Sequence, residues 1–368
     1  MKLPILRTSN KLRGLELCQG TDHCKDCSLS YRNGGRCSTC TQLHKSVLSP
    51  NFQACYQECN TCNKGYKVET PAICCRSPLK DAYLTALSRG TDYNNPVFNP
   101  VKQPLLTFSQ KAILNYAFGS PERIAPEEEI LFPDQEVALT TLSFVKGKQD
   151  VFYHSDLKKY LKLSPTTKLI LSTMSIDDHL EAAWEREQYG GDFYERVGVD
   201  YWTPLAFSIF GREPKMFQYY QFLRLLWSAE QGKSHFVISA VPRTSLQIND
   251  LLEKWLEASP QVMFNAQMAT NEHIVHHKTE AKFWDDLAPK HVAFWYVGAS
   301  TPVFMANIRE VLPKREIYWV SSKPMWCANS GKILRKDGGE ARAEFSISKK
   351  DLLYENAQNF TAIVSKYG

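Results

Sequence analysis

The chain has 368 residues, of which 43% are hydrophobic and 12% aromatic, so it exceeds one average domain and is not a disordered chain. The formal net charge of +5 lies at the N-terminal end, because residues 1–100 contain 13 Lys and Arg against 7 Asp and Glu. A basic end on a nearly neutral body suits contact with a polyanion such as nucleic acid. The alternative is a basic, solvated face of a small module.

The N-terminal stretch "MKLPILRTSNKLRGL" has no sustained apolar segment, and no run approaches the ~18 apolar residues of a membrane span. We therefore expect a soluble, cytoplasmic protein without a membrane partner. In that reducing compartment, dense cysteines favour metal ligation over disulfides.

Ten of the eleven cysteines fall within residues 1–80, which we interpret as a cysteine-rich metal-binding module. The segments "HCKDC" and "RCSTC" are C-x2-C knuckles, and two such knuckles supply the four thiolates of a tetrahedral zinc site. The later cysteines supply enough thiolates for a second zinc ion or for an iron–sulfur cluster. The candidate ligands are Cys18, Cys24, Cys27, Cys37, Cys40, Cys55, Cys59, Cys62, Cys74 and Cys75.

Residues 81–135 are rich in Asn, Pro and Gly and indicate a connector, with one possible helix over 108–118. From 136 to 368 apolar strands alternate with amphipathic helices. The expected strands are 137–145, 168–175, 199–209, 235–241, 262–269, 291–299 and 316–322. The expected helices are 177–187, 214–231, 244–259, 280–288 and 301–313.

Nearly continuous apolar strands, spaced roughly 25–35 residues apart, indicate a buried parallel sheet. The predicted fold class is α/β, a (β/α)8-like (TIM) barrel preceded by the cysteine-rich module. An open doubly wound sheet is the alternative. No strand runs into G-x-G-x-x-G or a P-loop, which disfavours a dinucleotide-binding or P-loop fold.

Catalytic residues of a parallel barrel stand at the carboxyl ends of its strands. Asp177 and Asp178 follow the second expected strand as candidate general acid, general base or nucleophile, although one of them could simply cap the next helix. Arg243 and Gln267 follow the fourth and fifth strands and are further catalytic candidates.

The segment "VGAST" is a candidate anion cradle, because Gly298 permits close backbone approach and Ser300 precedes a helix N-terminus. Lys323, after the last expected strand, is a candidate phosphate ligand. The histidines of "NEHIVHHK" (271–278) offer metal ligands, but an exposed loop is the favoured interpretation there.

Residues 174–242, from "MSIDDHLEAAWE" through "SHFVISAVP", resemble an uncharacterised family of bacterial and phage barrel-like domains. That resemblance implies the barrel fold and draws attention to Asp177, Asp178 and Arg224, without naming a reaction.

Two other families offer weaker resemblances. Cys55, Cys59 and Cys62 have the C-x3-C-x2-C spacing of radical-S-adenosylmethionine enzymes, although Thr61 stands where that family usually has an aromatic residue. That resemblance implies an iron–sulfur cluster and S-adenosylmethionine. The combination of barrel, cysteine site and carboxylates is similar in architecture to tRNA-guanine transglycosylases, but the cysteines here precede the barrel.

Together these features predict a metal-containing, nucleic-acid-associated protein whose barrel modifies a nucleotide or base. The first alternative is a non-catalytic nucleic-acid-binding subunit that works with other protein subunits. The second is a radical-S-adenosylmethionine-like enzyme.

The metal is directly testable. Anaerobically purified protein is expected to carry about two zinc ions per chain by elemental analysis. Absorbance near ~400 nm together with bound iron would instead show an iron–sulfur cluster. Protein without any metal would contradict the metal-binding module altogether.

Overall fold

The computed structural model describes residues 98–118, 124, 129–146, 156–174, 180, 183, 193–206, 215–239, 248–266, 271–299 and 301–368. All ten cysteines from Cys18 to Cys75 lie outside these residues, as do the metal-binding predictions made for them.

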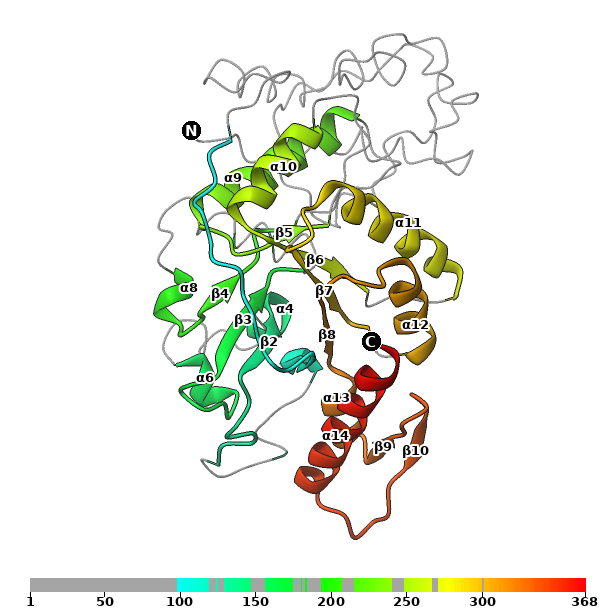
Figure 1. Cartoon of the computed structure of the whole chain (residues 1–368). Coiled ribbons are helices and arrows are strands. Elements are labelled where there is room, and N and C mark those ends of the chain that lie inside the picture. The colour runs from blue at the N-terminus through cyan, green and yellow to red at the C-terminus, as the bar shows by residue number, and fades with distance from the viewer. Residues whose placement is uncertain are drawn as a thin grey trace, which may run out of the picture.

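The described chain contains two parallel sheets, and this confirms the predicted α/β class (Figure 1). The larger sheet has the order β1–β8–β7–β6–β5, and every neighbouring pair in it is parallel. Its strands are β1 (Ala112–Leu114), β5 (Val237–Ile238), β6 (Gln261–Asn265), β7 (Ala293–Val297) and β8 (Ile317–Ser321). The smaller sheet, also parallel, has the order β2 (Val137–Thr141), β3 (Lys168–Ser172), β4 (Tyr201–Trp202).

The two sheets meet at both of their ends. Asn115, one residue beyond β1, forms a parallel bridge with Leu139 in β2. At the other end, the backbone N–H of His235 donates to the carbonyl of Trp202 at 3.0 Å, so the chain entering β5 lies along β4. Strands β1 to β8 therefore follow one another in space in chain order.

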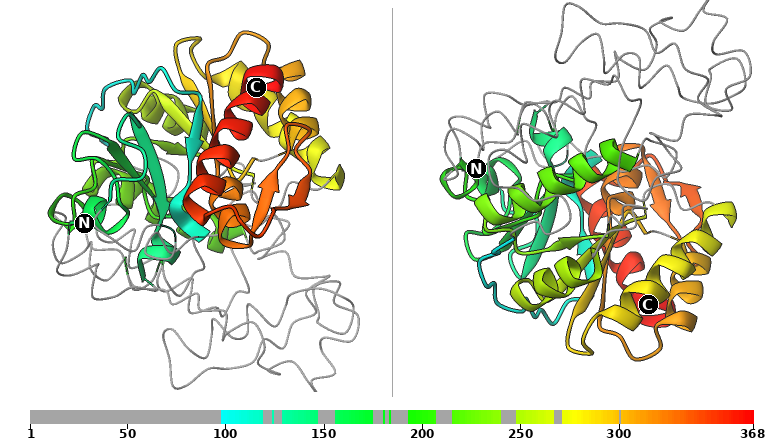
Figure 2. Two further views of the ribbon diagram at one scale, coloured as in Figure 1. Left: turned by 90° about the horizontal axis from the view of Figure 1, so that it is seen from below. Right: turned by 90° about the horizontal axis from the view of Figure 1, so that it is seen from above.

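Helices follow most of the strands and cover the outer faces of the sheets (Figure 2). They are α4 (Leu142–Lys146), α6 (Leu157–Tyr160), α8 (Phe193–Arg196), α9 (Lys215–Gln231), α10 (Ile248–Ala258), α11 (Asn271–Leu287), α12 (Pro302–Val311), α13 (Lys323–Asn329) and α14 (Lys349–Tyr367). A 3-10 helix η4 (Tyr116–Phe118) and a hairpin of β9 (Lys332–Leu334) and β10 (Glu340–Arg342) complete the described elements.

Side chains on the two faces of the larger sheet have different surroundings. Tyr296 and Trp319 pack edge-on against Phe304 of α12, so they lie on the helix-covered outer face. Trp295 and Tyr318 alternate with them along the strands and occupy the opposite, inner face, where their rings stack with centroids 4.3 Å apart.

Aromatic rings fill the inner face near the amino ends of the strands. Trp295 meets Phe236, which precedes β5, with ring centroids 5.4 Å apart and the rings edge to face. It also meets Phe108, which precedes β1, at 6.1 Å. The amino end of the inner face is thus occupied mainly by aromatic rings.

Each of the seven expected ranges contains a strand, although residues 142–146 form α4 and the strands β4 and β5 have only two residues each. The predicted helix over 108–118 is wrong. That segment instead contains β1, which joins β8 in the larger sheet. β1 has only three residues, and aromatic residues flank it on both sides, so no two-residue periodicity is visible in the sequence. The sheet therefore begins well before residue 136.

The predicted exposed loop at 271–278 is also wrong, because these residues form the first half of α11. The buried side of α11 carries Ile274, His277, Ala281 and Trp284, which have helical spacing. A histidine at one of these inward positions interrupts the apolar pattern by which the helix would have been recognised.

Arg315 joins the carboxyl end of α11 to the start of β8. Its guanidinium donates to the Asp285 carboxylate at 2.7 Å and to the backbone carbonyls of Ala288 at 3.2 Å and Val292 at 3.3 Å. Burial opposes ionisation of Asp285, but the hydrogen bonds from Arg315 and Lys290 outweigh it and lower the pKa of that carboxyl. Arg315 is 4% exposed, so its guanidinium lies beneath the surface and relies on these protein acceptors.

Arg315→Ala should lower the free energy of unfolding by about 3–5 kcal/mol, because it leaves several backbone carbonyls without their donor and Asp285 with only Lys290. Lys290→Ala is the matched control, since Lys290 contacts the same carboxylate at 3.2 Å with its side chain 80% exposed. Its loss should cost less than about 1 kcal/mol. Urea denaturation measures both, and equal effects would contradict the assigned role of Arg315.

His235 should make stability depend on pH. Burial lowers the pKa of this imidazole to about 4, below its ordinary value of 6.5. The folded state therefore holds the neutral ring. The contribution of His235 to the free energy of unfolding is complete above about pH 6.5 and decreases as the pH falls toward 4. The loss reaches about 3 kcal/mol. His235→Phe should flatten this part of the stability profile, whereas the exposed His276→Asn should leave it unchanged. An unaltered slope in His235→Phe would contradict this assignment.

Candidate functional site

Small polar side chains converge at the carboxyl ends of the strands on the inner face. In parallel sheets, paired residues point to the same side, and every second residue along a strand does so too. Tyr318 and Trp295 point inward. Residues paired with the inward positions therefore also point inward, and this identifies the inward residues of β1, β2, β3, β4 and β6. The inward residues at or just after these strand ends are Asn115, Thr141, Ser172, Thr203 and Asn265, which we call the mouth residues.

Asn115 carries the least satisfied polar group of the mouth residues. Its backbone N–H donates to the carbonyl of Ser321 at 2.9 Å, and its Oδ1 accepts from the N–H of Ala117 at 2.9 Å. The side chain is only 1% exposed, yet within the described chain Nδ2 has no hydrogen-bond partner. Leaving a buried amide donor unpaired lowers the stability of the fold by about 1–3 kcal/mol. The unpaired Nδ2 is available to a hydrogen-bond acceptor of a ligand.

Thr203 belongs to a compact hydroxyl network that joins β3 to β4. Its Oγ1 accepts from the N–H of Thr173 at 2.8 Å and lies 2.9 Å from Thr173 Oγ1. Thr173 Oγ1 also bonds to the carbonyl of Pro204 and accepts from the N–H of Ala206 at 3.3 Å. This network fixes the carboxyl ends of β3 and β4 relative to each other and uses most of the capacity of these hydroxyls.

The exposure of the mouth residues differs. Thr141, Ser172 and Thr203 are buried, whereas Asn265 at the end of β6 is exposed. The described part of the mouth is therefore open to solvent on the β6 side.

The turn after β7 begins at Gly298, part of the predicted anion cradle. Gly298 has a positive φ of 95°, which residues with side chains rarely adopt, and its N–H donates to the Val320 carbonyl at 2.8 Å. Thr301 then caps α12 by accepting from the N–H of Phe304. The Gly298 N–H is therefore used within the sheet, and any anion at this turn would meet the first turn of α12 instead. Ser300 lies outside the described residues.

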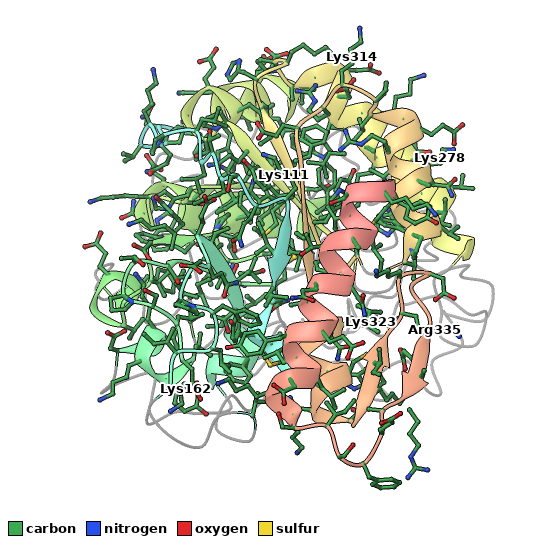
Figure 3. The ribbon with its side chains drawn as sticks, turned by 60° about the horizontal axis from the view of Figure 1, so that its bottom comes forward. Lys111, Lys162, Lys278, Lys314, Lys323 and Arg335 are labelled. Atoms are coloured by element: carbon green, nitrogen blue, oxygen red, sulfur yellow. The ribbon has the colours of Figure 1, made fainter. Side chains whose placement is uncertain are left out.

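Lys323 opens α13 and points to the β9–β10 hairpin (Figure 3). Its Nζ donates to the carbonyl of Gly338 at 2.9 Å and pairs with Glu340 at 3.4 Å. These contacts fasten the hairpin beside the ends of β7 and β8. For Lys323 to bind phosphate, it would have to leave these partners.

The other predicted catalytic residues, Asp177, Asp178, Arg243 and Gln267, lie outside the described residues. Arg224 of α9, to which a sequence resemblance drew attention, is 0% exposed.

The part of the chain that the structure describes contains no cluster of three or more His, Cys, Asp or Glu side chains suited to a metal ion. The buried Cys327 is not a ready ligand, because burial raises the pKa of its thiol to about 11. His277 is 8% exposed and packs against Phe304, as an apolar residue of α11 would.

A hollow of about 430 Å³ lies on the outer face between β1, residues 132–135 and α14. Its polar lining is partly engaged already, since Gln135 accepts from the Tyr116 hydroxyl at 3.0 Å and donates to the Val137 carbonyl at 2.9 Å. We place the functional site at the carboxyl ends of the strands, because polar groups from several strands converge there and not in this hollow.

The sequence predictions missed four of the five mouth residues. Asn115 was hidden by the incorrect helix prediction, and Thr141, Ser172 and Thr203 were treated as ordinary strand residues. A polar residue at the last inward position of each apolar strand is the signal that would have found them.

The sequence matches no protein-family model, and no curated protein matches it. Among the described helices, none is both long enough and apolar enough to cross a membrane.

Proposed function

We propose that strands β1 to β8 close into a (β/α)8 barrel. The bridge between Asn115 and Leu139 and the bond from His235 to Trp202 support closure, because they join the two sheets at both ends. The aromatic cluster at the amino ends also supports it, since barrel interiors are filled by layers of side chains.

We further propose that this barrel belongs to a nucleic-acid-associated protein that binds and modifies a nucleotide or base at its mouth. The observation that carries this proposal is the buried, unpaired Nδ2 of Asn115 among the inward polar residues. A base presents carbonyl and ring-nitrogen acceptors that such an amide recognises. The proposal assigns base recognition to Asn115 and its neighbours.

The remaining roles follow from the order of the residues along the chain. Asp177 and Asp178 follow β3 and would act as general acid, general base or nucleophile, and Arg243 and Gln267 would assist at the ends of β5 and β6. The turn at Gly298 and Ser300 would direct the phosphate to the first turn of α12, and Lys323 would contact it after leaving Gly338 and Glu340. The cysteine-rich module would bind zinc or an iron–sulfur cluster and contact nucleic acid; S-adenosylmethionine would be required only if the cluster is of the radical type.

A second candidate function is a non-catalytic nucleic-acid-binding subunit. The bonds between Thr173 and Thr203 favour it, because they satisfy mouth hydroxyls within the protein. The two functions differ in whether the mouth binds a free nucleotide.

Asn115→Ala should weaken the binding of a ribonucleoside 5′-monophosphate at least about tenfold, since it removes the unpaired donor. Calorimetry with the four monophosphates, and with inorganic phosphate for comparison, measures this. Thr140→Val is the matched control, because Thr140 is equally buried and lacks a partner for Oγ1 within the described chain, but lies on the outer face.

Binding that is equal in both variants would contradict the role of Asn115. Failure of the unmodified protein to bind any monophosphate would favour the non-catalytic subunit.

A further inference from the structure

Two exposed aromatic rings and two cations form one continuous row at the β9–β10 hairpin. The ammonium of Lys332 lies over the Trp326 ring, 4.5 Å from its centroid. The guanidinium of Arg342 lies over the Phe345 ring, 4.9 Å from its centroid. Lys332 and Arg342 are directly paired across the hairpin, so their side chains lie on the same face. We call Trp326, Lys332, Arg342 and Phe345 the cation–aromatic row.

The rings of this row are open to solvent. Trp326 is 40% exposed and Phe345 is 93% exposed. A single exposed apolar residue is common on protein surfaces and needs no explanation. Here, however, two exposed rings each carry a cation on one face. Arrangements of this kind suit ligands that are both anionic and planar.

The charges of the row impose a cost on the folded protein. Like charges placed directly opposite each other destabilise an antiparallel pair, and Lys332 and Arg342 are so placed. Glu340 relieves part of this repulsion by pairing with Lys332 at 2.9 Å. Within the described residues, Arg342 has no carboxylate partner of its own. Residues 323–350 contain seven Lys and Arg against three Asp and Glu, so an anion would be attracted to the whole segment.

The hairpin is held firmly in place. The Asn356 side chain of α14 accepts from the N–H of Leu334 at 2.6 Å and donates to the carbonyl of Lys332 at 3.0 Å. Lys323 binds Gly338 at the turn, and that turn packs against Pro302 at the start of α12. The hairpin is thus held at the edge of the molecule beside α13 and α14 (Figure 1), with its turn against the start of α12 and the row at the opposite end of the strand pair.

We propose that the cation–aromatic row binds single-stranded nucleic acid, with bases stacking on Phe345 and Trp326 and phosphates contacting Arg342 and Lys332. Paired bases hide their faces inside a duplex, so exposed rings select unpaired strands. The proposal rests on the proposed function and extends it, because the row would bind the strand from which the mouth receives a base.

The test is fluorescence anisotropy of a labelled twelve-nucleotide oligo(U) or oligo(dT) with the full-length, metal-loaded protein. Phe345→Ala should weaken binding by about fivefold to about a hundredfold, as expected for the loss of one stacking platform. Val275→Ala is the matched control, because Val275 is a 72% exposed apolar residue on α11, and it should change nothing. Because Phe345 is highly exposed, its replacement should not impair folding. Equal thermal unfolding midpoints for Phe345→Ala and the unmodified protein would exclude a folding defect as the cause of weaker binding.

Salt dependence tests the cations separately. Arg342→Gln should lower the slope of log affinity against log salt concentration by about one, whereas Arg342→Lys should keep the slope. Wild-type affinity and slope in Phe345→Ala and Arg342→Gln would overturn the proposal. So would binding of phosphatidylserine vesicles without binding of oligonucleotide, which would identify a membrane surface instead.

These outcomes are separate from those for the proposed function. If mononucleotide binding depends on Asn115 but oligonucleotide binding does not depend on Phe345, the proposal for the cation–aromatic row is wrong and the proposal for the mouth residues stands. Loss of both kinds of binding in the unmodified protein would contradict both proposals.

Discussion

The register of the parallel strands is the constraint on which the rest of this structure depends. Because side chains alternate between faces, one set of pairings decides at once which residues meet the helices and which meet each other. Trp319 and Tyr296 are directed toward α12, while Trp295 and Tyr318 are directed inward. A shift of one residue would turn both the mouth polar groups and the aromatic cluster toward the helices.

The same register divides the inner face along its length. Its amino end is filled by stacked and edge-to-face rings, which bury a large apolar area. The Tyr318 hydroxyl there is hydrogen-bonded to Phe108 and Glu316, whereas the Trp295 indole N–H has no partner within the described chain. Its carboxyl end carries amides and hydroxyls that are partly paired with each other. Rigidity at one end and unsatisfied polarity at the other are what a binding site on a fixed scaffold requires. The hairpin after α13 adds charge at this polar end, where Lys323 fastens it.

Much of the architecture was predictable from sequence, because long apolar strands and helices with a regular apolar stripe leave a clear periodic signal. The strand over 293–297 and helix α10 are examples. β1 was not predictable, since three residues are too few to show alternation and its partner β8 is distant in the sequence. The hairpin and α14 were missed as well. The hairpin sequence is polar, and the apolar stripe of α14 is interrupted by the buried Asn356.

The candidate site was less predictable than the fold for a physical reason. Sequence order shows which residues follow a strand, but the inward direction of Asn115 depends on its pairing with Leu139, and that depends on the position of β1. Residues such as Gly298 were recognisable because their backbone requirement is local. Asp177, Asp178, Arg243 and Gln267 remain predictions made from their positions after strands.

An experimental structure of the metal-loaded, full-length protein with a ribonucleoside monophosphate tests the central claim most directly. The account predicts eight parallel strands in a closed ring, with the base of the nucleotide bonded to Asn115 Nδ2 at the carboxyl ends. An open sheet with no pairing between β4 and β5, or a nucleotide bound in the hollow beside α14, would contradict it.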